Sequence, residues 1–224
     1  MIISKFVRVV SKLLLVIIIV IAGGILVYRY WWIPELKETF QKIKNINSIK
    51  YEYVDFTENG VLMKKKVWRK GQGNEMKIRI EDDYLGDGET EFITIFDFKE
   101  KVAYVYSPKN NIARKSIINS SPSESYAEGT EKDFLDEANW ITSHHPIFLG
   151  KQSLDGKESL VVFCFDDVVK VKEWISKEYG IRIKGKELFS QEHHEWQREN
   201  LEINIDISDD IFNLPPGAEI ISKE

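Results

Sequence analysis

The residues best suited to bind a metal or to catalyse a reaction are four histidines, which form the adjacent pairs 144–145 and 193–194. Glu192 and Glu195 flank the second pair, and this combination of ligand types suggests zinc. A zinc-binding helix, however, carries its two histidines one turn apart with a glutamate between them. Adjacent residues on a strand point to opposite faces, so neither pair would chelate a metal easily. The spacing favours surface or turn histidines, and we expect no metal site.

Core packing and turn formation explain the other candidates for catalysis better than a catalytic role does. Cys164 is the one cysteine and lies in the apolar run 160–165, where a buried thiol behaves as a small hydrophobic side chain. The acidic stretches 81–83 and 166–167 fall at predicted strand ends, so turn formation explains them better than paired catalytic carboxylates. The turn at 71–73 is followed by a strand pattern rather than a helix, unlike a phosphate-binding loop. We therefore predict no enzyme activity and no cofactor.

Aromatic side chains cluster between residues 51 and 106, in the first half of the predicted sheet. Packing in an ordinary core is one explanation for each of them. The other is that several line an apolar cavity, because ligand pockets are mostly apolar with few polar groups. The candidate lining residues are Tyr51, Tyr53, Trp68, Met76, Ile78, Phe92, Phe96, Tyr104 and Tyr106.

Most of these residues occur where apolar and polar side chains alternate, which is typical of half-buried β-strands. The alternation begins at residue 48, and Asn59 and Gly60 form a predicted hairpin turn. Three consecutive lysines at 64–66 suggest a solvated sheet edge, because lysines commonly protect edges. We expect about nine to eleven strands in one antiparallel sheet, which curls as its twist accumulates.

Two segments have helical rather than strand spacing. Residues 35–47 and 132–143 each repeat apolar side chains every three or four positions. Between the strands and the second helix, residues 120–131 are rich in serine, glutamate and glycine and are predicted to form a loop. The predicted fold class is α+β, with one curved antiparallel sheet and short helices on its concave face.

The N-terminal region predicts a transmembrane helix. Residues 13–28 carry no charge and lie between Lys12 and Arg29, with aromatic residues directly after them. This run is shorter than the roughly 20 residues that cross a bilayer core. Snorkelling cations and interfacial aromatic rings make up the difference. We therefore divide the chain into a cytoplasmic tail with its anchor, 1–32, and an extracytoplasmic domain, 33–224.

Two questions about this anchor stay open. A cleaved signal peptide would also explain Lys5, Arg8, Lys12 and the small residues 22–24, although the apolar run continues beyond them. Basic residues lie on both sides of the run, so charge does not fix its orientation. We place the protein in the cell membrane, crossing it once, with its C-terminal domain outside the cytoplasm, because the N-terminal tail is too short to carry a function.

A set of short stretches, in chain order between residues 35 and 220, carries a resemblance to a known family. They are the predicted hairpin 67–71 with 76–80, the segment 95–99 leading into 102–108, the later hairpins 149–158 and 172–181, and the closing stretch 212–220. Through them the sequence resembles the LolA/LolB/RseB-like family, which includes periplasmic lipoprotein carriers.

The resemblance implies a half-barrel of antiparallel strands, with helices that cover an apolar cavity. In the carriers this cavity holds lipoprotein acyl chains. Arg69 stands where the carrier has an arginine that hydrogen-bonds to the helical lid, and the alternative for Arg69 is a solvated cation at a hairpin end. A retained anchor departs from the carrier, which must move through the aqueous space.

Two functions follow from these observations. The first is a membrane-anchored, non-enzymatic binding domain that holds a lipid, a lipoprotein acyl chain or an apolar peptide in its concave cavity. The second is an extracytoplasmic sensor or regulator of envelope signalling, which binds a membrane-protein partner. A large dry cavity would favour the first function and a packed interior the second. The net charge of −5 argues against a nucleic-acid partner, because phosphate binding needs a basic surface.

Overall fold

The computed structural model describes residues 2–27, 32–57, 60–119, 121, 128–165, 170–188 and 194–222. The chain forms two compact units, Met1–Thr39 and Phe40–Glu224. Helix α1 (Ile2–Val27) and most of α2 (Ile33–Gln41) belong to the first unit. A 3₁₀-helix, η2 (Lys42–Asn45), follows α2, so the helix predicted over 35–47 is split into two parts.

The apolar side chains described along α1 are exposed, including Leu13 at 62% and Val20 at 67%. Within the described part of the chain, no helix has both the length and the apolar character needed to cross a membrane. The structure therefore does not support the transmembrane helix that the sequence predicted.

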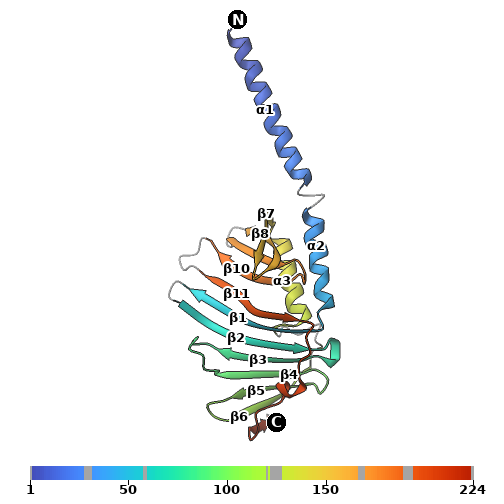
Figure 1. Ribbon diagram of the computed structural model, residues 1–224, viewed down its shortest axis with the longest axis vertical. Coiled ribbons are helices and arrows are strands. Elements are labelled where there is room, and N and C mark those ends of the chain that lie inside the picture. The colour runs from blue at the N-terminus through green and yellow to red at the C-terminus, as the bar shows by residue number, and fades with distance from the viewer. Residues whose placement is uncertain are drawn as a thin grey trace. The chain divides into compact units, whose positions relative to one another are not determined.

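Within the described residues, the C-terminal unit contains one sheet of twelve strands (Figure 1). Its order is β12-β6-β5-β4-β3-β2-β1-β11-β10-β9-β8-β7, and every neighbouring pair is antiparallel except β12 with β6. The strands are β1 (Ser48–Thr57), β2 (Gly60–Lys70), β3 (Lys77–Asp83), β4 (Phe92–Asp97), β5 (Val102–Ser107), β6 (Ile112–Ile117), β7 (Ile147–Leu154), β8 (Lys157–Phe165), β9 (Lys170–Ser176), β10 (Arg182–Glu187), β11 (Glu195–Ile203) and β12 (Glu219–Ser222).

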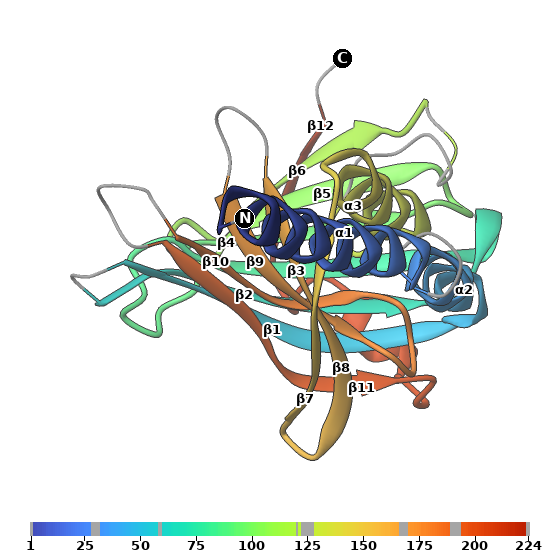
Figure 2. The same cartoon turned by 90° about the horizontal axis from the view of Figure 1, so that it is seen from above.

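The predicted α+β class with one curved, mostly antiparallel sheet is confirmed (Figure 2). The expected number of strands was too low, because β6 lacks clear alternation. The expectation that lysines 64–66 mark a sheet edge is wrong, since β2 lies between β1 and β3. The turn predicted at 59–60 joins β1 to β2, although Asn59 lies outside the described residues.

One glycine fixes the turn that follows β2. Gly71 has a φ of +81°, which L-amino acids with a side chain rarely adopt. A Cβ at this position would lie 2.7 Å from the carbonyl oxygen of Glu75. Glycine is therefore required where the chain leaves β2, passes through the 3₁₀-helix η3 (Gly73–Glu75) and enters β3.

The two faces of the sheet are covered by different segments. Residues directly opposite each other on paired strands share a face, so Tyr51, Val67 and Ile80 form one row. Gly129, which leads into helix α3 (Glu131–Ser143), contacts this row, because a Cβ at Gly129 would lie 3.0 Å from Val67. We call this side the helix face. The predicted helix 132–143 agrees with α3 to within one residue at its start.

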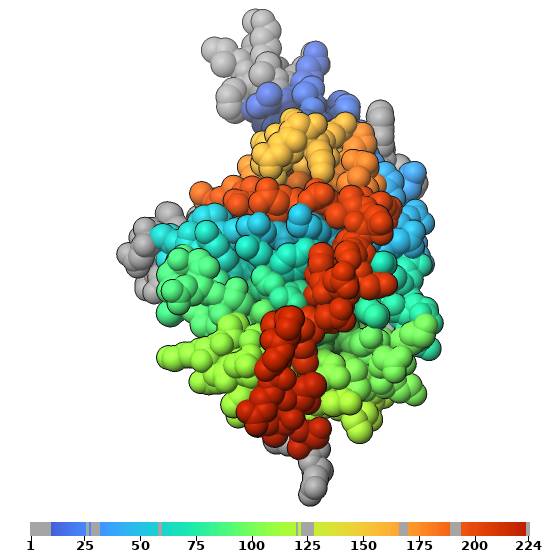
Figure 3. Space-filling view, turned by 60° about the horizontal axis from the view of Figure 1, so that its bottom comes forward, coloured from blue at the N-terminus to red at the C-terminus, as the bar shows by residue number. Residues whose placement is uncertain are grey.

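The C-terminal segment covers part of the opposite face. Ile207 and Phe212, the latter in the 3₁₀-helix η4 (Asp209–Phe212), join a core cluster with Ile93, Ile95 and Tyr106. Figure 3 shows this segment in red, where it crosses strands coloured cyan to green. The chain then ends as the short parallel strand β12 beside β6. The sheet thus has buried apolar side chains on both faces, which explains its high aromatic content.

Candidate functional site

Helix α3 begins with a well-formed N-terminal cap. The hydroxyl of Thr130 accepts a hydrogen bond from the Asp133 amide at 3.1 Å, and the Asp133 carboxylate accepts one from the Gly129 amide at 2.9 Å. This reciprocal arrangement satisfies amide groups that a helix start otherwise leaves unpaired. Phe134, Ala138 and Ile141 then recur at helical spacing and are all buried.

Arg69 on β2 connects the helix face to the segment that leads into α3. Its guanidinium donates a hydrogen bond to the Gly129 carbonyl at 3.2 Å and another to the Ile46 carbonyl. It also lies 5.9 Å from the centre of the Phe134 ring. Arg69 is 1% exposed, so the alternative of a solvated hairpin-end cation is wrong. Burial lowers the pKa of Arg69 to about 10, against the opposing effect of Tyr51.

A buried ion pair fastens the middle of α3 to β11. Arg198 donates two hydrogen bonds to the Glu137 carboxylate, at 2.8 and 3.0 Å, and a third to the Arg182 carbonyl at 2.6 Å. Only 2% of the Arg198 side chain is exposed. The Arg198 guanidinium also lies over the rings of Tyr51 and Phe134, at 5.1 and 5.2 Å.

A second buried pair lies beside the first, within the sheet. Arg182 on β10 donates to both carboxylate oxygens of Glu173 on β9, at 2.6 and 3.1 Å. Its guanidinium packs between the rings of Trp196, at 4.6 Å, and Trp140 on α3, at 5.5 Å. Glu137 lies 3.8 Å from Arg182 and so joins the two pairs. We call Glu137, Glu173, Arg182 and Arg198 the ionic cluster.

Burial dominates the electrostatics of these carboxylates. Desolvation raises the pKa of Glu173 to about 7, although Arg182 acts in the opposite direction. Desolvation and the nearby Glu137 raise the pKa of Asp133 to about 6, while Arg198 lowers it. Charged groups removed from water need matched partners, and the ionic cluster supplies them. These contacts hold α3 against the sheet.

The nine predicted cavity residues do not share one face. Register places Ile78 opposite Phe96 on the helix face, together with Tyr51, Tyr53 and Phe92. On the opposite face, Trp68 and Tyr104 pack against the core cluster that contains Tyr106. Met76 is buried in the turn before β3. These nine side chains therefore cannot all line one cavity, and a ligand-binding role for the helix-face members stays a prediction.

His144 and His194 take part in local contacts. The Nδ1 atom of His144 lies 2.7 Å from the Trp140 carbonyl, at the end of α3. The Nε2 atom of His194 lies 2.6 Å from Asp55. His193 and the acidic pair 166–167 lie outside the described residues.

A group of carboxylates near the end of β3 resembles a cation site but is built as a turn. Oxygens of Asp83, Asp87 and Glu91 lie within 4.8 Å of one another. Asp83 accepts hydrogen bonds from the amides of Asp87 and Gly88, at 3.2 and 2.9 Å. Side-chain to backbone bonds of this kind are typical of aspartate in turns, so we assign no metal here.

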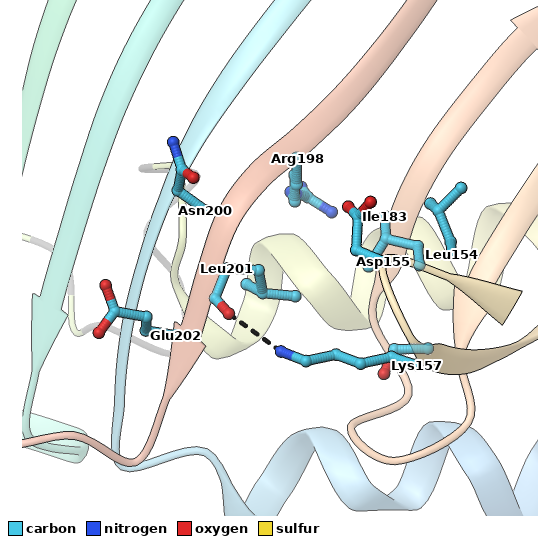
Figure 4. A pocket seen from close by; sticks show the side chains of 9 residues that line it. Leu154, Asp155, Lys157, Ile183, Arg198, Asn200, Leu201 and Glu202 are labelled. Atoms are coloured by element: carbon cyan, nitrogen blue, oxygen red, sulfur yellow. Dashed lines mark hydrogen bonds between the residues drawn. The ribbon is translucent and has the colours of Figure 1, made fainter.

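An open cleft lies beside the second half of β11. Its volume is about 380 Å³, and it is lined by Leu154, Asp155, Lys157, Ser176, Ile183, Arg198, Asn200, Leu201 and Glu202. Figure 4 shows Lys157 reaching across it to the Leu201 carbonyl on β11. A smaller cavity of about 270 Å³ lies between Met76 and the α3 residue Leu135, with Gly73, Glu131, Lys132, Asp136 and Asn139 also in its lining.

Sequence reasoning missed the ionic cluster and the cleft. One signal was present, because Glu173 occupies the same alternating positions as Val171 and Ile175. A charged residue in an apolar stripe requires a buried partner. For Arg182 the pattern predicted an exposed side chain rather than a buried one, since Arg182 lies between two apolar neighbours. The pairing of β10 with β9 becomes irregular at Arg182.

Comparison with known proteins shows the fold. No protein-family model matches the chain, and no curated protein matches its sequence. Among solved structures, a conserved uncharacterised protein from Thermus thermophilus aligns at a TM-score of 0.50 and 11% identity, over 84% of this chain and 98% of that one.

MucB aligns equally well. Its structure gives a TM-score of 0.51 at 11% identity, over 84% of this chain and 66% of MucB. The complex of MucB with MucA(peri) gives 0.50 at 12% identity, over 85% of this chain and 61% of that one. The chain thus spans less than two thirds of MucB. These alignments confirm the resemblance at the level of the fold: the chain has the LolA/LolB/RseB-like fold.

Proposed function

We propose that this chain is a non-enzymatic binding domain that recognises a protein partner, rather than a carrier of acyl chains. The observation that carries the proposal is the occupied helix face. Phe134 of α3 and the sheet residues Tyr51, Arg69 and Ile78 are each no more than 1% exposed. Side chains of α3 and the ionic cluster therefore take the space that a carrier keeps for its ligand.

The cavity beside α3 supports the same choice. Its volume of about 270 Å³ is below the range of roughly 300–1,000 Å³ that is usual for ligand pockets. Carboxylates and a lysine contribute to its lining, which does not suit an acyl chain. The complex of MucB with MucA(peri) supports protein recognition by this fold, because MucB there binds a protein.

Carriage of a lipid is the second candidate, and Met76 and Leu135 favour it. These two apolar side chains line the cavity between the β2–β3 turn and α3. Movement of α3 away from the sheet would enlarge this cavity, but it would also break the Arg198–Glu137 pair. Lipid carriage therefore requires a second conformation in which the ionic cluster is open.

A fatty-acid titration separates the two functions. The full chain in detergent is titrated with a fluorescent fatty acid, and we expect no saturable binding. The variant Glu137→Gln, which loosens α3, serves as the comparison, because a latent cavity would then give saturable binding. Stoichiometric binding by the unaltered chain would contradict the protein-recognition proposal.

We also propose that residues 1–32 attach the domain to the outer side of a cell membrane. The sequence supports this, since residues 13–28 are uncharged and Leu, Ile and Val predominate among them. Alkaline extraction of membranes tests it: the full chain should stay in the membrane pellet, and the C-terminal domain should be accessible to protease from outside the cell. Release into the soluble fraction would contradict the anchor, and protection from protease would contradict the orientation.

A further inference from the structure

The sheet is incomplete between β11 and β10. Along the described strands, β11 pairs with β1 from Glu195 to Ile203 but with β10 only at Glu195, Trp196 and Gln197. The stretch from Arg198 to Ile203 therefore has a strand neighbour on one side only. The cleft of about 380 Å³ lies beside this stretch, where the next strand would run.

Side chains replace the missing strand at two backbone positions. The Lys157 amine donates a hydrogen bond of 3.1 Å to the Leu201 carbonyl (Figure 4). The Arg198 guanidinium donates one of 2.6 Å to the Arg182 carbonyl, on the β10 side of the gap. Backbone polar groups need partners, and here they find a lysine and an arginine side chain instead of strand amides. The Lys157 bond is exposed and easily exchanged.

The walls of the cleft suit an extended peptide. Leu154, Ile183 and Leu201 contribute apolar side chains to the lining, while Asp155 and Glu202 add polar groups. A strand that binds here would place alternate side chains toward this lining and the solvent, because the side-chain period of a strand is two.

The charges do not favour a small ion as the occupant. Two carboxylates, those of Asp155 and Glu202, face two cations, Lys157 and Arg198, in the same lining. Arg198 is already engaged by Glu137, and Glu202 is paired with Lys50 at 3.0 Å. The lining therefore has no excess of one charge, and recognition would come from the backbone and from apolar contact.

We propose that this cleft binds an extended segment of a partner protein, which adds as a short strand to β11 over residues 201–203, beyond Asn200, whose φ of +51° interrupts the extended backbone. The inference rests on the proposed protein-binding function and names its site. Strand addition to an exposed edge is a common mode of peptide recognition, in which main-chain hydrogen bonds supply the affinity. On binding, the Lys157 amine leaves the Leu201 carbonyl to the incoming amide. The same sheet already accepts one short strand of four residues, β12 beside β6.

The test uses a fluorescein-labelled peptide of sequence Thr-Leu-Thr-Leu-Thr and the full chain in detergent. Binding is followed by fluorescence anisotropy, and its position by hydrogen exchange. We expect saturable binding with slower amide exchange at residues 201–203. An analogue with N-methylated leucines keeps the side chains but lacks two amide donors, and it should bind about tenfold more weakly.

Two variants locate the site. Lys157→Met removes the competing amine and keeps most of the side-chain stem, so it should bind the peptide several-fold more tightly. Leu149→Asp alters the outer edge strand β7, where Leu149 is 53% exposed, and it should bind as the unaltered chain does. Equal affinity for the N-methylated peptide, loss of binding in Leu149→Asp, or no saturable binding at millimolar peptide would overturn the proposal.

The fatty-acid and peptide experiments distinguish an error about this cleft from an error about the proposed function. Saturable fatty-acid binding would contradict the function without affecting the peptide measurement. Co-purification of a protein partner, together with no peptide protection at residues 201–203, would leave the function intact and reject this cleft.

Discussion

The ionic cluster makes a quantitative prediction about the variant Glu137→Gln. This change removes one charge of the pair and leaves Arg198, whose side chain is 2% exposed, without the carboxylate that it bonds directly. Breaking a buried pair by removing one partner costs about 3–5 kcal/mol of folding free energy. The matched control is Glu75→Gln, because Glu75 forms an ion pair with Lys99, at 2.9 Å, on the surface. The Lys99 side chain is 57% exposed and the Glu75 side chain 69%. Such a surface pair contributes little to stability, because water screens its charges.

Urea denaturation, followed by circular dichroism, measures the difference. With a denaturant slope of about 2–3 kcal/mol per molar, the midpoint for Glu137→Gln should fall by about 1–2 M, and that for Glu75→Gln should hardly change. The double variant Arg198→Met with Glu137→Leu should recover most of the loss, because apolar side chains can replace a buried pair at little cost. If Glu137→Gln and Glu75→Gln have the same midpoint, the cluster does not hold α3 to the sheet.

Three further predictions concern pH, a buried arginine and a glycine. The pKa of Asp133 is raised to about 6 in the folded chain, above its ordinary value of 3.8. The folded state therefore binds the Asp133 proton more tightly than the unfolded state does. The free energy of unfolding should fall as pH rises from about 4 to 6. Urea midpoints across that range should show a smaller slope for Asp133→Asn, and an unchanged slope would count against the shift. Arg69→Met removes the donors to the Gly129 and Ile46 carbonyls. We expect the free energy of unfolding to fall by about 2–3 kcal/mol and amide exchange at the start of α3 to become faster. Unchanged exchange there would refute the role of Arg69 in holding this segment. A Cβ at Gly185 would collide with the Trp196 indole. Gly185→Ala should therefore destabilise the fold by about 1–3 kcal/mol and alter the near-ultraviolet circular dichroism. An unchanged spectrum would show that no collision occurs.

The sequence was a good guide to elements whose side chains alternate. Strand β3 buries alternate side chains, as expected, and α3 has its apolar residues at helical spacing. Local pattern is sufficient for these two elements because their buried residues recur at the period of the element. Strand β6 was missed because its side chains do not alternate clearly between apolar and polar.

The candidate cavity was harder to predict because it depends on register. Tyr51 and Trp68 fall on opposite faces only because Tyr51 pairs with Val67. That pairing depends on the turn and on an irregularity after Asp55, and a shift of one residue would reverse every side chain on the strand. The ionic cluster depends on contacts between distant segments, such as Glu137 with Arg198. No local pattern contains that information.

Helix α3 closes the helix face, and we propose that the chain therefore recognises a protein rather than a lipid. Native mass spectrometry of the full chain, isolated from its own membranes in mild detergent, tests this claim most directly. We expect a complex with a second protein and no lipid released when the chain is unfolded. One lipid molecule per chain, retained through purification and released only on unfolding, would contradict the claim.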